Sequence, residues 1–136
     1  MILRRKAREF AVQMLFQWEM SGGEPWRVES HFWKNARAAK DTRVFANQLF
    51  EGASAAAKQC DAHISEHAKN WRIERIAVMD RTILRLAVYE LKHMDTPPKV
   101  VINEAITLAK KFSDEDSPKF INGVLDAIHK SLATRH

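Results

Sequence analysis

The sequence has few of the residues that mark a disulfide scaffold, a disordered chain or a membrane protein. Its 136 residues include one cysteine, four glycines and four prolines. The single Cys60 excludes an internal disulfide and suits a reducing compartment, and the scarcity of glycine and proline disfavours long disordered segments. No apolar run reaches the about 18 residues of a membrane span, and the N-terminus is charged before a signal-peptide core develops, so we expect a cytoplasmic protein.

What remains is the composition of an ordinary folded domain. Hydrophobic residues make up 46% of the chain and charged residues 29%, and a chain of this length can bury roughly two thirds of the surface that it exposes when unfolded. We therefore expect residues 1–136 to form a single domain. Lysine and arginine number 22 against 17 aspartates and glutamates, a formal net charge of +5. This excess favours a polyanionic partner without identifying one.

Apolar residues recur at three- and four-residue spacing along most of the chain, and no segment alternates as a half-buried strand does. We therefore expect an all-α fold, a compact bundle of about six to seven helices. The predicted helices cover residues 3 to about 21, 28–39, about 42 to 64, about 77 to 95, 101–112 and 118–132.

Breaking and capping residues indicate several helix ends. The glycine pair at 22–23 supplies the positive φ that often follows a helix. Asp41 or Thr42 can cap the third helix, a corner is expected over 71–76, and the prolines at 97–98 end the fourth helix because neither can donate a backbone hydrogen bond. Before the last helix, Ser117-Pro118 combines a suitable N-cap with a proline at the first helical position.

Two strings could suggest a metal site. His63-Ile64-Ser65-Glu66-His67 matches the H-x-x-E-H zinc pattern, which places both imidazoles on one helix face. A hydrolytic zinc site also needs a third protein ligand and an open position, and no downstream acidic motif supplies the ligand, so a polar helix end is favoured. The acidic run at 114–116 lacks the length and spacing of a Ca²⁺ loop and suits the N-terminus of the following helix.

The chain also lacks the motifs of the common enzyme classes. It contains no glycine-rich phosphate loop after a strand, no G-x-S-x-G, and no cysteine with an identifiable histidine partner. We therefore expect neither a catalytic residue nor a metal or other cofactor.

The basic start favours RNA among the polyanions. Arg4, Arg5, Lys6 and Arg8 place four cations within five residues, and on a helix Arg5 and Phe16 lie within about 20° of each other around the axis. Cations beside an aromatic face suit single-stranded RNA, whose phosphates pair with arginine and whose bases stack on rings. The alternative is that Phe16 belongs to the core and the cations form a solvated helix end, and the pattern alone does not separate the two.

Three blocks of the chain, residues 5–16, 80–91 and 102–126, closely resemble the NusB family of bacterial transcription antitermination factors. The third block is the most specific. The resemblance implies an all-α fold of two packed three-helix halves and a factor that works by assembly rather than by chemistry. Its expected partners are boxA-type single-stranded nascent RNA, the ribosomal protein NusE, and a complex on RNA polymerase that suppresses termination, notably on ribosomal RNA operons.

The same resemblance assigns site residues in this chain. The partner-facing positions are Asp80 and Arg81, where charged pairs would set register with NusE. Phe16 stands where the family usually has tyrosine, and Pro118 replaces a polar residue of the family. For Phe120 the helical spacing leaves a core role equally open. The RNA-binding positions are Arg4, Arg5, Lys6, Arg8, Phe16, Asp116, Lys119 and Phe120.

Two other functions fit parts of the pattern. NusB-like domains also stand at the front of ribosomal RNA methyltransferases, although such an enzyme needs a further cofactor domain. A helical adaptor that binds only protein is the second alternative. Whether the protein is a monomer or a homodimer stays open, because a helix buries the same apolar stripe in either case.

Overall fold

The computed structural model describes residues 2–68 and 71–134. Within these ranges the chain forms helices and no strands, which confirms the all-α prediction. In chain order the elements are α1 (Arg4–Ser21), α2 (Pro25–Asn35), α3 (Lys40–Ala55), α4 (Ala57–His67), the short 3₁₀ helix η1 (Ile73–Arg75), α5 (Val78–His93), α6 (Pro98–Phe112) and α7 (Ser117–Thr134).

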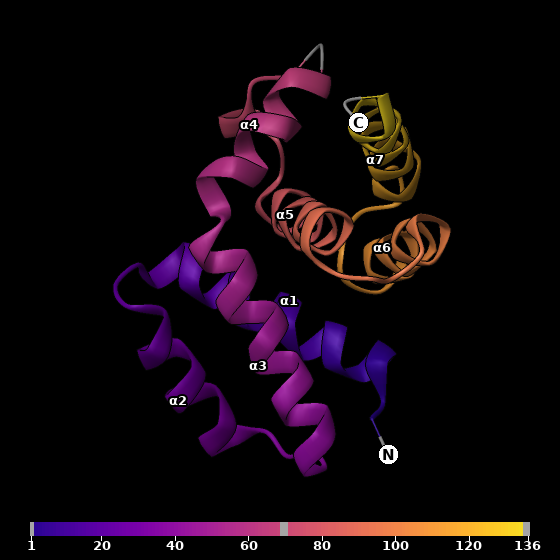
Figure 1. The fold of residues 1–136 in the computed structure, drawn as a ribbon. Coiled ribbons are helices and arrows are strands. Elements are labelled where there is room, and N and C mark those ends of the chain that lie inside the picture. The colour runs from indigo at the N-terminus through magenta and orange to yellow at the C-terminus, as the bar shows by residue number, and fades with distance from the viewer. Residues whose placement is uncertain (1, 69–70, 135–136) are drawn as a thin grey trace.

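The helices form two packed groups that meet at α5. Helices α1, α2 and α3 lie together, while α4, α6 and α7 surround α5, which Figure 1 shows nearly end-on. Helix α5 also packs against α1 and α3, so it joins the two groups. The buried apolar side chains form one cluster with members from all seven α-helices. This arrangement matches the expected two halves and places the start of α5 beside both groups.

An aromatic cluster attaches α2 to α1. The rings of Phe10, Phe32 and Trp33 meet edge to face, with centroids 5.0 to 5.8 Å apart, an arrangement that the ring quadrupoles favour. The Trp33 indole N–H donates to Asn47 Oδ1 of α3 at 2.7 Å, so its polar group is satisfied where the ring is buried. The aromatic residues that made the sequence pattern of this segment irregular therefore form its core contact.

Several helix ends were predicted correctly. Gly22 has φ +69° and its N–H bonds to the Trp18 carbonyl, as expected of a helix-ending glycine. The corner over 71–76 contains η1. Helix α2, however, begins at Pro25 and ends at Asn35, earlier than expected at both ends. The early start is explained by proline, which is well suited to the first helical turn.

The prediction of one long third helix was wrong. It is two helices, α3 and α4, which change direction at Ala56 with φ −96° and ψ 13°. Alanine carries no breaking signal, so the apolar pattern continues through the bend. The predicted N-cap of this helix, Asp41 or Thr42, was also wrong. Ala39 precedes the first turn of α3, and the Thr42 hydroxyl instead accepts a hydrogen bond from the Leu3 N–H at 3.1 Å.

The prolines and Ser117 act differently from the prediction. Helix α5 already ends at His93, and Pro97 and Pro98 begin α6 as its N-cap and first residue. Ser117 is the first residue of α7 rather than its cap. Its hydroxyl donates to Asp80 Oδ2 of α5 at 3.0 Å. A side chain expected to stabilise its own helix therefore connects two helices.

A glutamate pair between α2 and α3 should make stability depend on pH. Burial, followed by a hydrogen bond and repulsion from Glu51, raises the pKa of Glu29 from 4.5 to about 7, while Arg43 opposes the rise. The folded state then holds the proton more tightly than the unfolded state, so stability falls as pH rises from about 4.5 to about 7. We expect Glu29→Gln to raise the melting temperature at pH 8 and to reduce this decline, measured by circular dichroism.

The exposed Glu24 at the start of α2 offers a matched control. Glu24→Gln removes the same charge from the same helix and should leave the pH profile of the melting temperature unchanged. Equal effects of the two substitutions would show that net charge, and not the Glu29–Glu51 contact, controls the profile.

Candidate nucleic-acid interface

The first turn of α1 presents three exposed cationic side chains, Arg4, Arg5 and Lys6. The Arg4 guanidinium lies 4.5 Å from the centre of the Phe45 ring of α3. Arg5 bonds to Glu104 of α6 at 3.1 Å but leaves 67% of its side chain exposed. Exposed ion pairs and exposed cation–π contacts are both weak in water, so both arginines can exchange these contacts for an anionic ligand.

These cations oppose the dipole of their own helix. The N-terminal turn of a helix is electropositive, and positive side chains there reduce its stability. The first turn of α1 has no acidic residue of its own. Two carboxylates partly offset this unfavourable charge: Glu104 of α6 pairs with Arg5, and Glu9 in the next turn of α1 lies 3.5 Å from Lys6. The resulting surface combines helix N–H groups and cations, which together attract an anion.

Arg8, in contrast, points inward and is 4% exposed. Its Nε and Nη2 donate to the two carboxylate oxygens of Glu90 on α5 at 2.8 and 2.7 Å, and Nη1 donates to Glu104 at 3.4 Å. Burial alone would lower the pKa of Arg8, but the hydrogen bond and charge of Glu90 raise it overall, so the guanidinium stays charged. The structure therefore gives Arg8 an internal ion pair in place of the expected phosphate contact.

Phe16 lies on the outer side of α1, half-buried, in a hollow of about 650 Å³ between α1 and α2. Met20 and His31 also line this hollow. The ring is neither in the buried core nor packed against it. Of the two interpretations of Phe16 that the sequence left open, the structure favours the accessible ring.

A second group of the predicted residues lies where α7 begins. Asp116 and Phe120 line a cavity of about 300 Å³, and Lys119 is exposed nearby on α7. The Phe120 ring is half-buried and also packs against the core, so it combines the two roles that its spacing left open. Trp71 and Arg75, from the corner between α4 and α5, line the same cavity.

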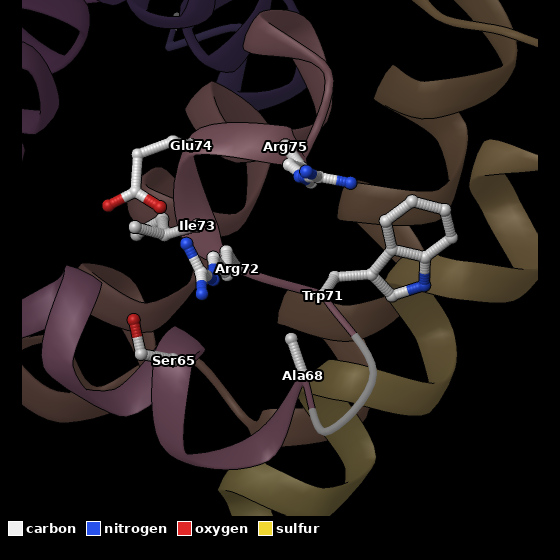
Figure 2. A pocket seen from close by; sticks show the side chains of 7 residues that line it. All are labelled: Ser65, Ala68, Trp71, Arg72, Ile73, Glu74 and Arg75. Carbon is white, nitrogen blue, oxygen red and sulfur yellow. The ribbon is translucent and has the colours of Figure 1, made fainter.

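Sequence reasoning missed Trp71 and Arg75 because the corner carries no helical periodicity. The available signal in the sequence was a large aromatic residue in a polar segment. In the structure, 54% of the Trp71 surface is exposed. Figure 2 shows that Trp71 and Arg75 project toward the same side, where the ribbon of α7 lies, while Glu74 projects away. A wider open hollow of about 820 Å³ borders the corner on the side of Ser65 and Ala68.

Asp80 and Arg81 hold the start of α5 in place. Asp80 is buried and accepts hydrogen bonds from the hydroxyls of Ser113 and Ser117. Arg81 donates to Glu19 of α1 at 2.6 Å and to the Ile73 carbonyl at 3.0 Å. Both charged groups are therefore largely engaged within the chain, and a contact with another protein would reach only their exposed edges.

The end of α6 connects the two groups of predicted RNA-binding residues. In its last turn, Lys111 donates to Glu9 of α1 at 2.7 Å. Just beyond that turn, Ser113 bonds to both Asp80 and Ser117. The end of α6 therefore contacts α1 through Lys111, and Ser113 contacts two residues that line the cavity at the start of α7.

The H-x-x-E-H string does not gather further ligands. His63 is buried, and the carbonyl of His63 lies 3.0 Å from His67 Nδ1. Across residues 2–68 and 71–134, no three histidine, cysteine, aspartate or glutamate side chains are grouped to hold a metal ion. Burial, with repulsion from Asp61, raises the pKa of Cys60 to about 11, which keeps its thiol protonated. No helix in the described part of the chain has the length and apolar character needed to cross a membrane.

Sequence comparison identifies the family of this fold. The profile of the NusB family matches residues 5–130. The chain belongs to the NusB family. It is 44% identical to the transcription antitermination protein NusB of Koribacter versatilis and 40% identical to that of Symbiobacterium thermophilum, in each case over 95% of this chain and 90% of the relative. The resemblance predicted from the three sequence blocks is thus confirmed.

Solved NusB structures share the fold. The crystal structure of the antitermination factors NusB and NusE in complex with double-stranded RNA contains a chain that is 33% identical to this one. It superimposes with a TM-score of 0.84 over 94% of this chain and 96% of that chain. NusB of T. maritima, at 35% identity, also gives a TM-score of 0.84, over 96% of this chain and 93% of that chain. The bundle described above is therefore the NusB fold.

Proposed function

We propose that this protein is a non-enzymatic transcription antitermination factor. It binds single-stranded boxA-type nascent RNA together with NusE, and the assembly joins RNA polymerase to suppress termination, notably on ribosomal RNA operons. Such a factor acts in the cytoplasm, where nascent bacterial RNA is made. The observation that carries the proposal is the exposed cationic first turn of α1, together with the accessible ring of Phe16 farther along the same helix. The solved complex of NusB and NusE with double-stranded RNA supports NusE and RNA as the partners.

The predicted residues of α1, and Lys119 of α7, then each have a physical task. Arg4, Arg5 and Lys6 exchange their weak internal contacts for phosphates, and Phe16 offers a face on which a base can stack. Lys119 adds a further cation on the far part of the surface. Arg8 contributes indirectly, because its contact with Glu104 helps to hold the carboxylate that orients Arg5.

Near the start of α5, the proposed NusE surface includes the edges of Asp80 and Arg81. The internal bonds of both side chains set the positions of the corner before α5 and of the loop before α7. A partner that docks here would therefore meet a preorganised surface, which reduces the entropic cost of binding.

The test is a titration of the protein with a short boxA RNA and a scrambled RNA of equal length, with and without NusE, at two salt concentrations. We expect tighter binding to boxA RNA, strengthened by NusE and weakened by salt. Equal, purely salt-driven binding to both RNAs would contradict a sequence-specific factor. Binding of NusE with indifference to RNA would instead favour the protein adaptor.

A further inference from the structure

We propose that the cavity between the corner after α4 and the start of α7 binds a single nucleobase of the RNA. The base stacks on Trp71 and Phe120, the Asp116 carboxylate accepts hydrogen bonds from its edge, and Arg75 contacts an adjoining phosphate. This inference rests on the proposed RNA-binding function, and it adds Trp71 and Arg75 to the residues that bind RNA.

The size of the cavity suits one base. Its volume of about 300 Å³ lies at the lower end of the range of small-molecule sites. Two aromatic side chains from separate parts of the fold, Trp71 and Phe120, contribute to its walls, with Ile76 and Ala77 as further apolar lining. Apolar walls with a few polar groups are the usual composition of a site for a planar heterocycle.

Trp71 is available for stacking. More than half of its surface is exposed, so a ligand can reach the indole. Among the described residues no ring packs on the Trp71 indole and no cation lies over it. The indole therefore keeps a face for a base, and stacking of this kind tolerates any base identity.

The charges favour a base over a phosphate inside the cavity. Three carboxylates, Asp80, Asp114 and Asp116, line it against one cation, Arg75, so a phosphate would be repelled. Asp80 is already engaged by Ser113 and Ser117. The exposed Asp116 makes no side-chain ion pair or hydrogen bond with the described residues and can accept N–H groups from a base edge.

Arg75 is placed to serve the RNA backbone. It is exposed, it projects to the same side as Trp71 (Figure 2), and it forms no ion pair within the described part of the chain. A guanidinium at the edge of the cavity can bind the phosphate that precedes or follows the inserted base.

The experiment combines protein variants with RNA variants. A series of boxA RNAs, each with one abasic position, is titrated in the presence of NusE against the wild type and Trp71→Ala. We expect one abasic position to weaken wild-type binding about tenfold. Trp71→Ala should also weaken binding to intact RNA, and the same abasic position should then cause a clearly smaller further loss than in the wild type, because only the contacts with Phe120 and Asp116 remain to be removed. Additive losses at every position would overturn the inference.

Matched variants separate stacking from folding and from charge. Trp26 on α2 is somewhat more exposed than Trp71, at 62%, and lies beside Arg27, so Trp26→Ala should bind as the wild type does. Trp71→Phe keeps an aromatic face and should retain most of the affinity. Arg75→Gln should lower the slope of log affinity against log salt by about 0.7, while Trp71→Ala should leave the slope unchanged.

The outcomes distinguish this inference from the function on which it rests. If the wild type does not prefer boxA RNA with NusE present, the proposed function fails and the inference fails with it. If the wild type binds boxA RNA but Trp71→Ala binds equally well, only the base-binding cavity is disproved.

Discussion

Replacing Glu90 with leucine should lower the free energy of unfolding by about 3 kcal/mol, because it leaves the buried Arg8 guanidinium without its main partner. Glu90 is 1% exposed and holds Arg8 through two short hydrogen bonds. The remaining contact of Arg8 with Glu104 is longer, at 3.4 Å, and compensates only in part. Chemical unfolding followed by circular dichroism measures the change.

A double variant tests whether the loss comes from the unpaired charge. Arg8→Met combined with Glu90→Leu replaces both partners by apolar side chains of similar length, and such replacements are often neutral or stabilising. We expect the double variant to regain most of the stability that Glu90→Leu loses. A single variant within about 1 kcal/mol of the wild type would contradict a structural role for the pair.

Neutralising Arg4, Arg5 and Lys6 together with glutamine should weaken RNA binding by more than tenfold at moderate salt. Each phosphate contact to a single strand contributes about 0.7 to the slope of log affinity against log salt, so the slope should fall by about 2. These side chains are exposed, with weak ion pairs for Arg5 and Lys6 and a ring contact for Arg4, so the fold should persist. Filter binding at a series of salt concentrations, with the melting temperature measured in parallel, tests both expectations.

A matched control variant removes three positive charges from other parts of the surface. Lys34, Lys58 and Lys130 are exposed on α2, α4 and α7. Their combined replacement by glutamine should leave the salt slope nearly unchanged, because distant surface charges are screened beyond about 10 Å at 0.1 M salt. Equal losses in the two triple variants would show that binding depends on net charge rather than on the start of α1.

These two experiments distinguish the roles of arginines that lie close together in the sequence. Arg5 and Arg8 belong to one run of positive charge, yet one faces solvent and the other lies between α1, α5 and α6. In the sequence the two arginines look alike, because residue type and proximity do not separate them. Glu90, which determines the orientation of Arg8, lies far away in the chain, so local reasoning could not identify the pair.

The helical content could be predicted because it depends on neighbouring residues. Apolar spacing in α1, α5, α6 and α7, and the glycine at 22, are local signals that act within a few residues. The bend at Ala56 left no such signal. Both α3 and α4 pack against α5, and such contacts are a property of the assembled helices.

The sequence by itself determined the helical class of this protein, the family to which it belongs, and the basic first turn of α1. Each of these depends on residue type and on spacing along the chain. Only the tertiary structure decided that Arg8 is internal, and that Trp71 and Arg75 share a cavity with Asp116 and Phe120. Contacts of this kind join residues far apart in the sequence, and the way the helices pack sets them, which no local pattern specifies.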